Sequence, residues 1–578
     1  MIVHQFLQSL LREAVASRFP DAVPSEMRVG PCPDARFGDY QSSSLIGFAK
    51  KANLNPRDLA ARIASQVLWP NWVEKVEAAG PGFLNFRLSS AHIGFLMREG
   101  LSNGNLFCAR PASPKSVVID FSSPNVAKPM HVGHIRSTIL GDSLARVFRF
   151  LGHAVITDNH VGDWGTQFGK LLVGWKRNLD RQSLLADPIG EMERLYREVN
   201  QACEANPSVL EHARLELAKL QKGDAENLRI WREMTDLSRV QFDSIYRRLG
   251  VRFDETLGES FYNPRLPSIV AELRESGLAR ESEGAIVVFF DGIPQLAAHA
   301  AIVQKSDGAS NYMTTDLATL DYRWKTWNPT EVIYVTDARQ QLHFQQLFAT
   351  FRQWRPGSAM HLRHVWFGKI LGEDGKPFST RAGDVIKLAD LLDEAEGRTL
   401  TTVSEKNPDL AEADRREIAR IVGLGAIKYA DLLPNRQSDY VFSWDKMLAL
   451  NGNTAPYLLY AGARIASIFR KSGSETSAAA NPATVSQITV TAKEEIELAK
   501  QLMNFGLVLE TVAEEARPNF LCNYLYGLAG QFTKFYENCP VLKSEGTVRE
   551  SRLALCHLTS RVLGQGLNLL GIETAERM

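Results

Sequence analysis

The stretch Ser116-Val-Val-Ile-Asp-Phe-Ser-Ser-Pro-Asn-Val-Ala-Lys-Pro-Met-His-Val-Gly-His134 decides the fold class of this chain. Its first six residues form a short apolar, β-branched run that predicts a buried strand. A helix is predicted next, because apolar residues recur on one helical face from Leu140 to Leu151. Residues 154–159 predict a second strand. A strand, a helix and a strand within about 45 residues indicate a βαβ unit with parallel strands.

Two histidines stand at the start of the predicted helix, just beyond the carboxyl end of the first strand. Open α/β sheets bind ligands at that edge, and helix N-termini favour phosphate. Gly133, between His131 and His134, allows a nucleotide to approach the backbone closely. Neutral imidazoles can donate hydrogen bonds to phosphate oxygens. The alternative interpretation is that the two histidines only cap the helix.

The rest of the chain divides by composition. Residues 1–112 predict an α+β unit, with an amphipathic helix at the N-terminus, a helix at 55–68 and a strand at 82–89. Residues 113–400 hold the βαβ unit, and the apolar runs 285–290 and 331–336 are candidates to extend its parallel sheet. A charged helical segment is predicted at about 175–250. Residues 401–578 are strongly helical apart from a flexible connection at 472–492.

Composition excludes several classes of protein. The 578 residues include 66 basic and 66 acidic side chains, so the net charge is zero and bulk-charge coating of nucleic acid is excluded. No apolar run reaches the ~18 residues that a membrane span needs. Six scattered cysteines without a C-x-x-C pair favour free thiols in a reducing cytosol over a zinc ribbon. We therefore expect a cytoplasmic multidomain protein without a structural metal.

Two common nucleotide-binding motifs are missing. The stretch GDWGTQFGK at 162–170 has the wrong spacing for a P-loop and lacks the Ser or Thr that follows the lysine. No G-x-G-x-x-G motif follows a predicted strand. Neither a Walker-type ATPase nor a dinucleotide dehydrogenase is therefore supported.

Residues 122–134, SSPNVAKPMHVGH, resemble the HIGH signature of class I aminoacyl-tRNA synthetases, in the form of the bacterial arginyl-tRNA synthetases. Blocks along nearly the whole chain resemble the same family in the same order. They are NHVGDWGTQFGKLL (159–172), GESFYNP (258–264), QKSDGASNYMTTDLATLDYR (304–323), TDARQQLHFQQLF (336–348), STRAGDVIKLADLLDEA (379–395) and APYLLYAGARI (455–465).

The resemblance implies a multidomain architecture. An N-terminal α+β tRNA-contacting domain (1–112) precedes an α/β Rossmann-type catalytic domain with a parallel sheet and insertions (113–400). A C-terminal all-α anticodon-binding bundle (401–578) follows. The implied reaction is the activation of L-arginine by ATP, accompanied by Mg²⁺, to arginyl-adenylate, followed by transfer to the 3′-terminal adenosine of tRNA(Arg). Family members of this kind generally require tRNA for the activation step. We expect a monomer.

The resemblance also implies a set of substrate-binding residues. Positioning and charge stabilisation dominate the implied reaction, so His131 and His134 would hold the ATP phosphates and stabilise the transition state. A guanidinium ion requires carboxylates placed for bidentate bonding. The positions that match the family's arginine contacts are Asp120, Ser123 and Asn125 with Gln340 for the backbone end, and Tyr312, Asp316 and Glu259 for the guanidinium.

Each of these positions has a purely structural alternative. Tyr312 and Asp316 are four residues apart and share a face if that segment is helical. Asp316 could instead cap a helix and Tyr312 could be half-buried core. Asp120 could merely end a strand.

The second class I signature is incomplete. Class I synthetases usually carry Lys-Met-Ser-Lys-Ser, whose lysines meet pyrophosphate, and the matching run here is Pro377-Phe-Ser-Thr-Arg381. Thr380 stands where the second lysine is expected, and an uncharged hydroxyl cannot neutralise a leaving pyrophosphate. Lys128 occupies the position at which other family members with this change carry a lysine. We therefore predict that Lys128 compensates, with Ser379, Thr380 and Arg381 beside ATP; the alternative is an exposed loop lysine.

The resemblance extends to the tRNA contacts. Tyr457 and Tyr460 lie three residues apart and could stack on splayed anticodon bases, or pack in the core. Arg464 could meet phosphate, or be solvated. Phe37 and Gln41 lie in a loop that resembles the part of the N-terminal domain that meets the tRNA elbow. Two rival interpretations are a non-catalytic tRNA-binding paralogue, supported by Thr380, and a small-molecule adenylyltransferase.

Overall fold

The computed structural model describes residues 2–20, 27–378, 385–472 and 487–575. The chain forms two compact units, Met1–Pro111 with Leu448–Met578, and Ala112–Met447. The ends of the sequence thus belong to one unit and its middle to the other. Within the described residues, no helix is both long and apolar enough to cross a membrane.

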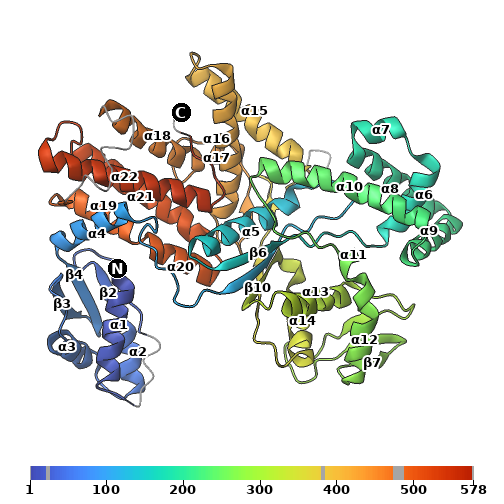
Figure 1. Cartoon of the computed structure of the whole chain (residues 1–578), viewed down its shortest axis with the longest axis horizontal. Coiled ribbons are helices and arrows are strands. Elements are labelled where there is room, and N and C mark those ends of the chain that lie inside the picture. The colour runs from blue at the N-terminus through green and yellow to red at the C-terminus, as the bar shows by residue number, and fades with distance from the viewer. Residues whose placement is uncertain (1, 21–26, 379–384, 473–486, 576–578) are drawn as a thin grey trace. The chain divides into compact units, whose positions relative to one another are not determined.

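A four-stranded parallel sheet organises the unit Ala112–Met447. Its strand order is β11-β10-β5-β6. The helix α5 (Val132–Phe150) connects β5 to β6 (Figure 1), which confirms the predicted βαβ unit. Gly152, with φ +95°, lets the chain leave this helix. The four strands are β5 (Ser116–Asp120), β6 (Ala154–Asp158), β10 (Glu331–Asp337) and β11 (His361–Phe367).

The two apolar runs that were candidates for this sheet have different outcomes. Residues 331–336 lie in β10, beside β5, as predicted. Residues 285–290 do not join the parallel sheet, so that prediction is wrong. Residues 285–288 form β8 of an antiparallel sheet whose strand order is β7-β8-β9. Glu283 and Gly284, at φ +52° and +77°, reverse the chain between β7 and β8. The strands are β7 (Ala279–Ser282), β8 (Ala285–Val288) and β9 (Ala301–Gln304).

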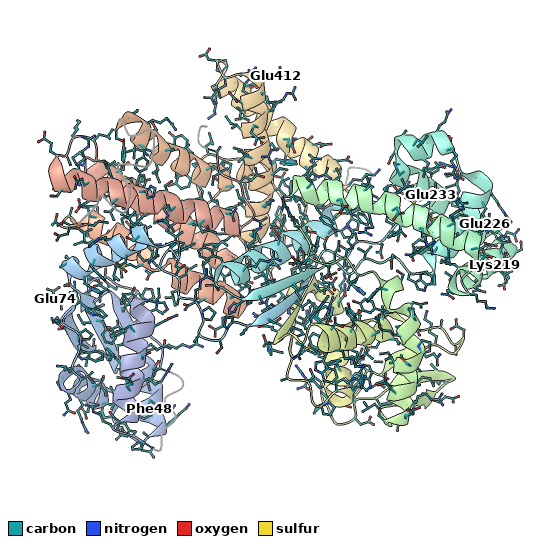
Figure 2. All side chains as sticks on the ribbon, viewed as in Figure 1. Phe48, Glu74, Lys219, Glu226, Glu233 and Glu412 are labelled. Carbon is teal, nitrogen blue, oxygen red and sulfur yellow. The ribbon has the colours of Figure 1, made fainter. Side chains whose placement is uncertain are left out.

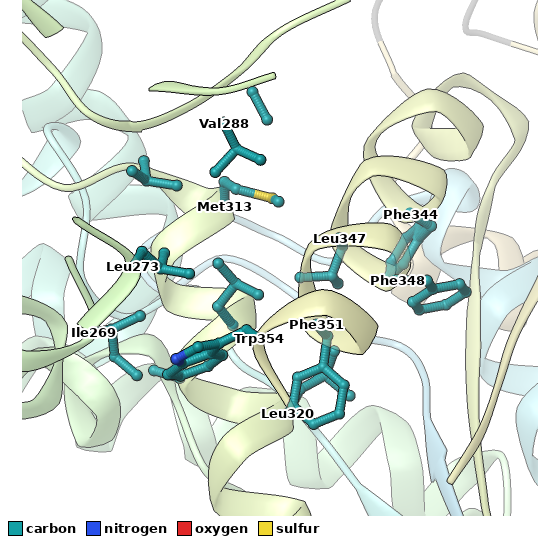
Figure 3. Packing of buried hydrophobic residues seen from close by; sticks show 14 of the residues in the cluster. Ile269, Leu273, Val288, Met313, Leu320, Phe344, Leu347, Phe348, Phe351 and Trp354 are labelled. Atoms are coloured by element: carbon teal, nitrogen blue, oxygen red, sulfur yellow. The ribbon is translucent and has the colours of Figure 1, made fainter. Parts of the chain in front are cut away.

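A hydrophobic core joins this small sheet to one side of the parallel sheet. It packs three helices, α12 (Leu266–Glu275), α13 (Tyr312–Thr326) and α14 (Gln341–Trp354). Figure 3 shows Phe344, Leu347, Phe348, Phe351 and Trp354 of α14 in one cluster with Leu320 of α13 and Leu273 of α12. This packing holds α13 and α14 in fixed positions, and both carry predicted site residues.

The remaining elements of this unit are mostly helical. Residues 175–250 form a group of helices, as predicted, that ends in the long helix α10 (Figure 1). The elements are α6 (Gln167–Asn178), α7 (Arg181–Ala186), α8 (Pro188–Ala205), α9 (Pro207–Gln221), α10 (Ala225–Arg248), α11 (Glu259–Tyr262), η1 (Asn263–Arg265), η2 (Ala338–Gln340), β12 (Ile370–Leu371), α15 (Leu388–Lys406), α16 (Glu412–Leu432), β13 (Tyr440–Val441) and α17 (Trp444–Met447).

The other unit combines a small antiparallel sheet, of order β1-β2-β4-β3, with helices from both ends of the chain. Helix α4 packs against α19 and α22 of the C-terminal segment. The elements are α1 (Val3–Ala16), β1 (Gly30–Pro31), β2 (Tyr40–Ser42), α2 (Ser44–Lys51), α3 (Pro56–Gln66), β3 (Val73–Ala79), β4 (Phe83–Leu88), α4 (Ser90–Ser102), α18 (Ala455–Lys471), α19 (Lys493–Met503), α20 (Phe505–Glu515), α21 (Asn519–Asn538) and α22 (Gly546–Leu569).

Candidate active site

The histidine pair is organised by the first turn of α5. His131 is the N-cap, and its Nδ1 accepts a hydrogen bond from the backbone N–H of Gly133 at 3.0 Å. The backbone N–H of His131 in turn donates to Nδ1 of His134 at 3.1 Å. Because both Nδ1 atoms accept, each neutral ring carries its proton on Nε2. The histidines therefore cap the helix, as the structural alternative held, and still keep one N–H donor each for a ligand.

Burial keeps both rings neutral. It lowers the pKa of His134 to about 4, and burial together with the charge of Lys128 lowers the pKa of His131. The two ring centroids are 4.1 Å apart. At neutral pH the pair therefore presents two uncharged donors side by side at a helix N-terminus, an arrangement suited to phosphate oxygens.

The loop before α5 has a strained backbone that its neighbours hold in place. Ser122, Ser123 and Ala127 have positive φ values of 73°, 48° and 61°. The Ser122 hydroxyl lies 2.8 Å from the Tyr246 hydroxyl, and the Ser123 N–H donates to Oδ1 of Asn159 at 3.1 Å. These contacts hold the loop that leads from β5 to the histidines in its strained backbone conformation.

Asp120 ends β5 and belongs to a buried ionic cluster. One Nη atom of Arg323, a fully buried side chain of α13, donates to Asp120 and to Asp158 at 2.6 Å each. The Ser123 hydroxyl donates to the second oxygen of Asp120 at 3.2 Å. The sequence analysis did not predict Arg323 as a site residue. The sequence feature that could have indicated a buried cation is that two neighbouring strands, β5 and β6, each end in an aspartate.

Helix α13 places Tyr312 and Asp316 on one face, where both contact His343 of α14. Nε2 of His343 lies 2.6 Å from Oδ2 of Asp316, and the Tyr312 ring meets the His343 ring edge-on at 4.8 Å. Tyr312 is 66% exposed, which contradicts the half-buried core alternative. His343 was missed, although it lies within a block already singled out, because nothing in the sequence pairs it with Asp316.

Glu259 begins α11 in an acidic environment. Burial raises its pKa to about 7, and the neighbouring charges of Asp316 and Asp163 act in the same direction, while His160 opposes them. Asp163 accepts hydrogen bonds from the N–H and the hydroxyl of Ser260, at 2.8 and 2.6 Å. Two predicted guanidinium ligands, Glu259 and Asp316, are thus electrostatic neighbours.

Asn125 and Gln340 are both exposed. Asn125 pairs with Gly162 in an isolated β-bridge, and a Cβ on Gly162 would lie 2.2 Å from the Asn125 amide oxygen. This glycine lets the loop approach that side chain closely. Gln340 ends η2, one residue before α14, the helix that carries His343.

A cavity of about 890 Å³ is lined by His131 of the histidine pair. Lys128 lines it, with Nζ 5.7 Å from the centroid of the Tyr196 ring on α8. Ser379, Thr380 and Arg381 lie outside the described residues, but Phe378 and Val385, on either side of them, line the same cavity. Among the residues that the structure describes, no group of three or more His, Cys, Asp or Glu could hold a metal ion.

The predicted tRNA contacts lie in the unit formed by the two ends of the chain. Phe37 is 52% exposed, and the guanidinium carbon of Arg36 lies 5.8 Å from the centroid of its ring. Gln41 instead donates to the buried Asn85 side chain at 2.8 Å, which commits its amide N–H to an internal contact. Of the two, Phe37 has the accessible surface.

On α18, Tyr460 is 53% exposed, whereas Tyr457 is partly buried against the Tyr526 ring at 5.5 Å. The guanidinium of Arg464 lies 4.8 Å from the centroid of the Tyr536 ring. These aromatic rings and this cation come from α18 and α21 of the helical bundle. Tyr460 therefore has the exposed surface that stacking requires, and less of the Tyr457 ring is accessible.

Three regions of the chain match known protein families. Residues 97–444 match the family described as tRNA synthetases class I (R), catalytic domain. Residues 458–578 match the DALR anticodon binding domain, and residues 5–88 match the arginyl tRNA synthetase N terminal domain. Together with the parallel sheet and the histidine-capped helix, these matches define the fold and site of the class I aminoacyl-tRNA synthetases.

Similarity to individual proteins extends over the whole chain. The arginine–tRNA ligase of Cellvibrio japonicus is 45% identical over 585 aligned positions, which cover 99% of this chain and 100% of that protein. The arginyl-tRNA synthetase structures from Plasmodium falciparum and Thermus thermophilus have TM-scores of 0.85 and 0.84 at 30% and 27% identity. They cover 100% and 99% of this chain, and 99% and 100% of their own. The chain belongs to the arginyl-tRNA synthetase family.

Proposed function

We propose that the arginine–tRNA ligase activity that family membership assigns to this chain proceeds in two steps at the carboxyl edge of the parallel sheet. The arginine carboxylate attacks the α-phosphate of ATP, which forms arginyl-adenylate and releases pyrophosphate. A hydroxyl of the tRNA 3′-terminal adenosine then attacks the arginyl carbonyl and releases AMP. The observation that carries the proposal is the acidic pair Glu259 and Asp316, which matches a guanidinium in charge.

ATP would lie beside His131 and His134, whose Nε2–H groups donate to phosphate oxygens as negative charge develops. The 890 Å³ cavity has room for the triphosphate end of ATP, and its lining includes the cations Lys128, Arg197 and Lys387 as well as the carboxylates of Glu193, Asp390 and Glu394. Mg²⁺ would enter with ATP and screen the phosphate charge, held mainly by the phosphates and water. Lys128 supplies the cation that Thr380 cannot, and Ser379, Thr380 and Arg381 complete the ATP contacts.

Arginine would place its guanidinium between Asp316 and Glu259, with the Tyr312 ring beside it. His343 holds Oδ2 of Asp316 and leaves the other oxygen for the substrate. The α-amino end would meet Ser123, Asn125 and Gln340. Asp120 would support the loop that carries Ser123 and Asn125, since Arg323 and Ser123 already occupy both of its carboxylate oxygens.

The tRNA would meet Phe37 near its elbow and Tyr460 and Arg464 near its anticodon, with Gln41 and Tyr457 in supporting positions. The domain boundaries 1–112, 113–400 and 401–578 belong to this proposal, as do tRNA-dependent activation and a monomeric state. A cytoplasmic location is supported by six free cysteines, of which five are buried.

The exchange of pyrophosphate into ATP tests the activation step. We expect exchange with L-arginine and tRNA(Arg), none with L-arginine alone, and none with L-citrulline, whose side chain is uncharged. Exchange that does not depend on tRNA would contradict only the proposed tRNA requirement, and the activation of arginine would stand. No exchange in any condition, with tRNA still bound, would favour the non-catalytic paralogue.

A lysine variant in the same assay tests the compensation for Thr380. Lys128→Ala is expected to lower the exchange rate about 100-fold, because removing one stabilising group from a developing phosphate charge typically costs that much. Lys406→Ala, an exposed lysine at the end of α15, is the matched control and should leave the rate unchanged. A Lys128→Ala rate equal to the control's would refute the role of Lys128.

A further inference from the structure

A second cavity, of about 540 Å³, lies beside α10 in the unit Ala112–Met447. Arg239, Asp243 and Arg247, four residues apart along one face of α10, line one side of it, and Arg252 comes from the segment that follows the helix. Among the described residues that line it, Asn159 and Tyr246 also hold the loop before the histidine pair.

The charges around this cavity are not neutralised. Three arginines face one aspartate, all four side chains are exposed, and within the described parts of the chain none of them forms an ion pair. Other charged side chains of α10 are paired. Glu226 lies 3.2 Å from Lys176 and Glu233 lies 2.6 Å from Arg181 (both glutamates are labelled in Figure 2). The cavity therefore concentrates unpaired positive charge on a helix whose other charges are partly balanced.

Two polar residues in the buried lining of the cavity, Asn159 and Tyr246, connect it to the catalytic loop. The Tyr246 hydroxyl lies 2.8 Å from the Ser122 hydroxyl and accepts a hydrogen bond from Nδ2 of Asn159 at 3.1 Å. Asn159 also holds the backbone N–H of Ser123. A ligand in this cavity would thus sit against residues that hold the strained loop before the histidine pair.

We propose that this cavity binds a phosphate-bearing anion through Arg239, Arg247 and Arg252. Guanidinium groups bind phosphate through paired N–H donors, and three of them around one cavity exceed what a single carboxylate can balance. The volume lies within the range of small-ligand pockets and admits several phosphate groups. The anion has two possible sources, a phosphodiester segment of the tRNA and a free polyphosphate. Only the first source rests on the proposed function.

Binding measurements on the full-length protein test this proposal with matched variants. Arg239→Gln/Arg247→Gln removes two cavity cations, and Arg252→Gln removes the third from outside the helix, in case the double variant does not fold. Arg274→Gln is the control, an exposed arginine on α12 away from the cavity. The affinity for tRNA(Arg) is measured across a salt series, and the stoichiometry of sodium tripolyphosphate binding is measured calorimetrically without tRNA.

If tRNA is the source, the double variant should reduce the slope of log affinity against log salt by about 2, and Arg252→Gln by about 1. If a free polyphosphate is the source, the cavity variants should lose one tripolyphosphate site while the tRNA slope stays unchanged. Cavity variants equal to Arg274→Gln in both measurements would overturn the proposal. A wild-type protein that binds no tRNA would refute the proposed function, and the tripolyphosphate comparison would still decide the cavity.

Discussion

At the scale of single residues, burial sets the protonation states on which the site depends. Removal from water favours the neutral form of any titratable group. It lowers the pKa of His134 to about 4 and raises the pKa of Glu259 to about 7. One physical cause thus yields uncharged donors toward ATP and a carboxyl group that is poised between its two forms at neutral pH.

Arginine binding is therefore expected to strengthen as pH rises through about 7. In the free protein Glu259 is protonated below its pKa, and the guanidinium requires the ionised form, so binding releases a proton. The KM for arginine should rise by up to about tenfold for each unit that the pH falls below about 7. The measurement is KM in pyrophosphate exchange from about pH 6 to about pH 8.

The control for this pH dependence is Glu259→Gln, which keeps the shape of the side chain and removes its titration. It should bind arginine more weakly and show a flat profile over the same range. A wild-type KM that does not change with pH would contradict the assignment of Glu259 to the guanidinium site.

At the scale of elements, α5 lies very close to the chain segment that leaves β5. A Cβ added to Gly141 would stand 2.2 Å from Cγ of the buried Phe121. Glycine at this point of the helix therefore permits the close packing that brings the first turn of α5, with His131 and His134, to the edge of the sheet.

Gly141→Ala is expected to destabilise this unit by about 1–3 kcal/mol, because the added methyl group forces the Phe121 ring or the helix to move. Gly397→Ala in α15 is the matched control, since nothing lies within 4 Å of the added Cβ at that exposed position. The control should stabilise the helix by up to about 1 kcal/mol. Differential scanning calorimetry compares them, and equal melting temperatures for Gly141→Ala and wild type would contradict the packing argument.

At the scale of the whole molecule, the two ends of the chain fold together. Arg561 of α22 donates hydrogen bonds to the backbone carbonyls of Leu101 and Asn103 at 3.0 Å each, at the end of α4. His4 and Gln5 of α1 contact Glu510 of α20 at 3.2 and 2.7 Å. The C-terminal bundle thus supplies partners for carbonyls that α4 cannot satisfy within itself.

Arg561→Gln should therefore loosen the end of α4 by about 1–3 kcal/mol through the loss of charged hydrogen bonds to those carbonyls. Hydrogen exchange of the amides in residues 90–108 measures this local opening. Arg12→Gln, an exposed arginine on α1, should leave the exchange unchanged. Equal protection in the two variants would indicate that Arg561 does not support α4.

The sequence alone determined the features that depend on local order. Apolar periodicity predicted the βαβ unit, and the position of His131 and His134 after its first strand placed them at the start of α5. The spacing of Tyr312 and Asp316 predicted their common helical face. These properties depend on residues within a few turns of one another, so a pattern along the chain contains them.

Only the tertiary structure decided which distant residues meet. Arg323 pairs with Asp120 across 203 positions, and His343 pairs with Asp316 across 27. The run 285–290 lies in the antiparallel sheet because a hairpin turn pairs it with β7, which apolar composition cannot reveal. The acidic surroundings of Glu259 and the arginine-lined cavity beside α10 likewise arise from packing. Burial and long-range pairing set these charges, and neither is encoded in local spacing.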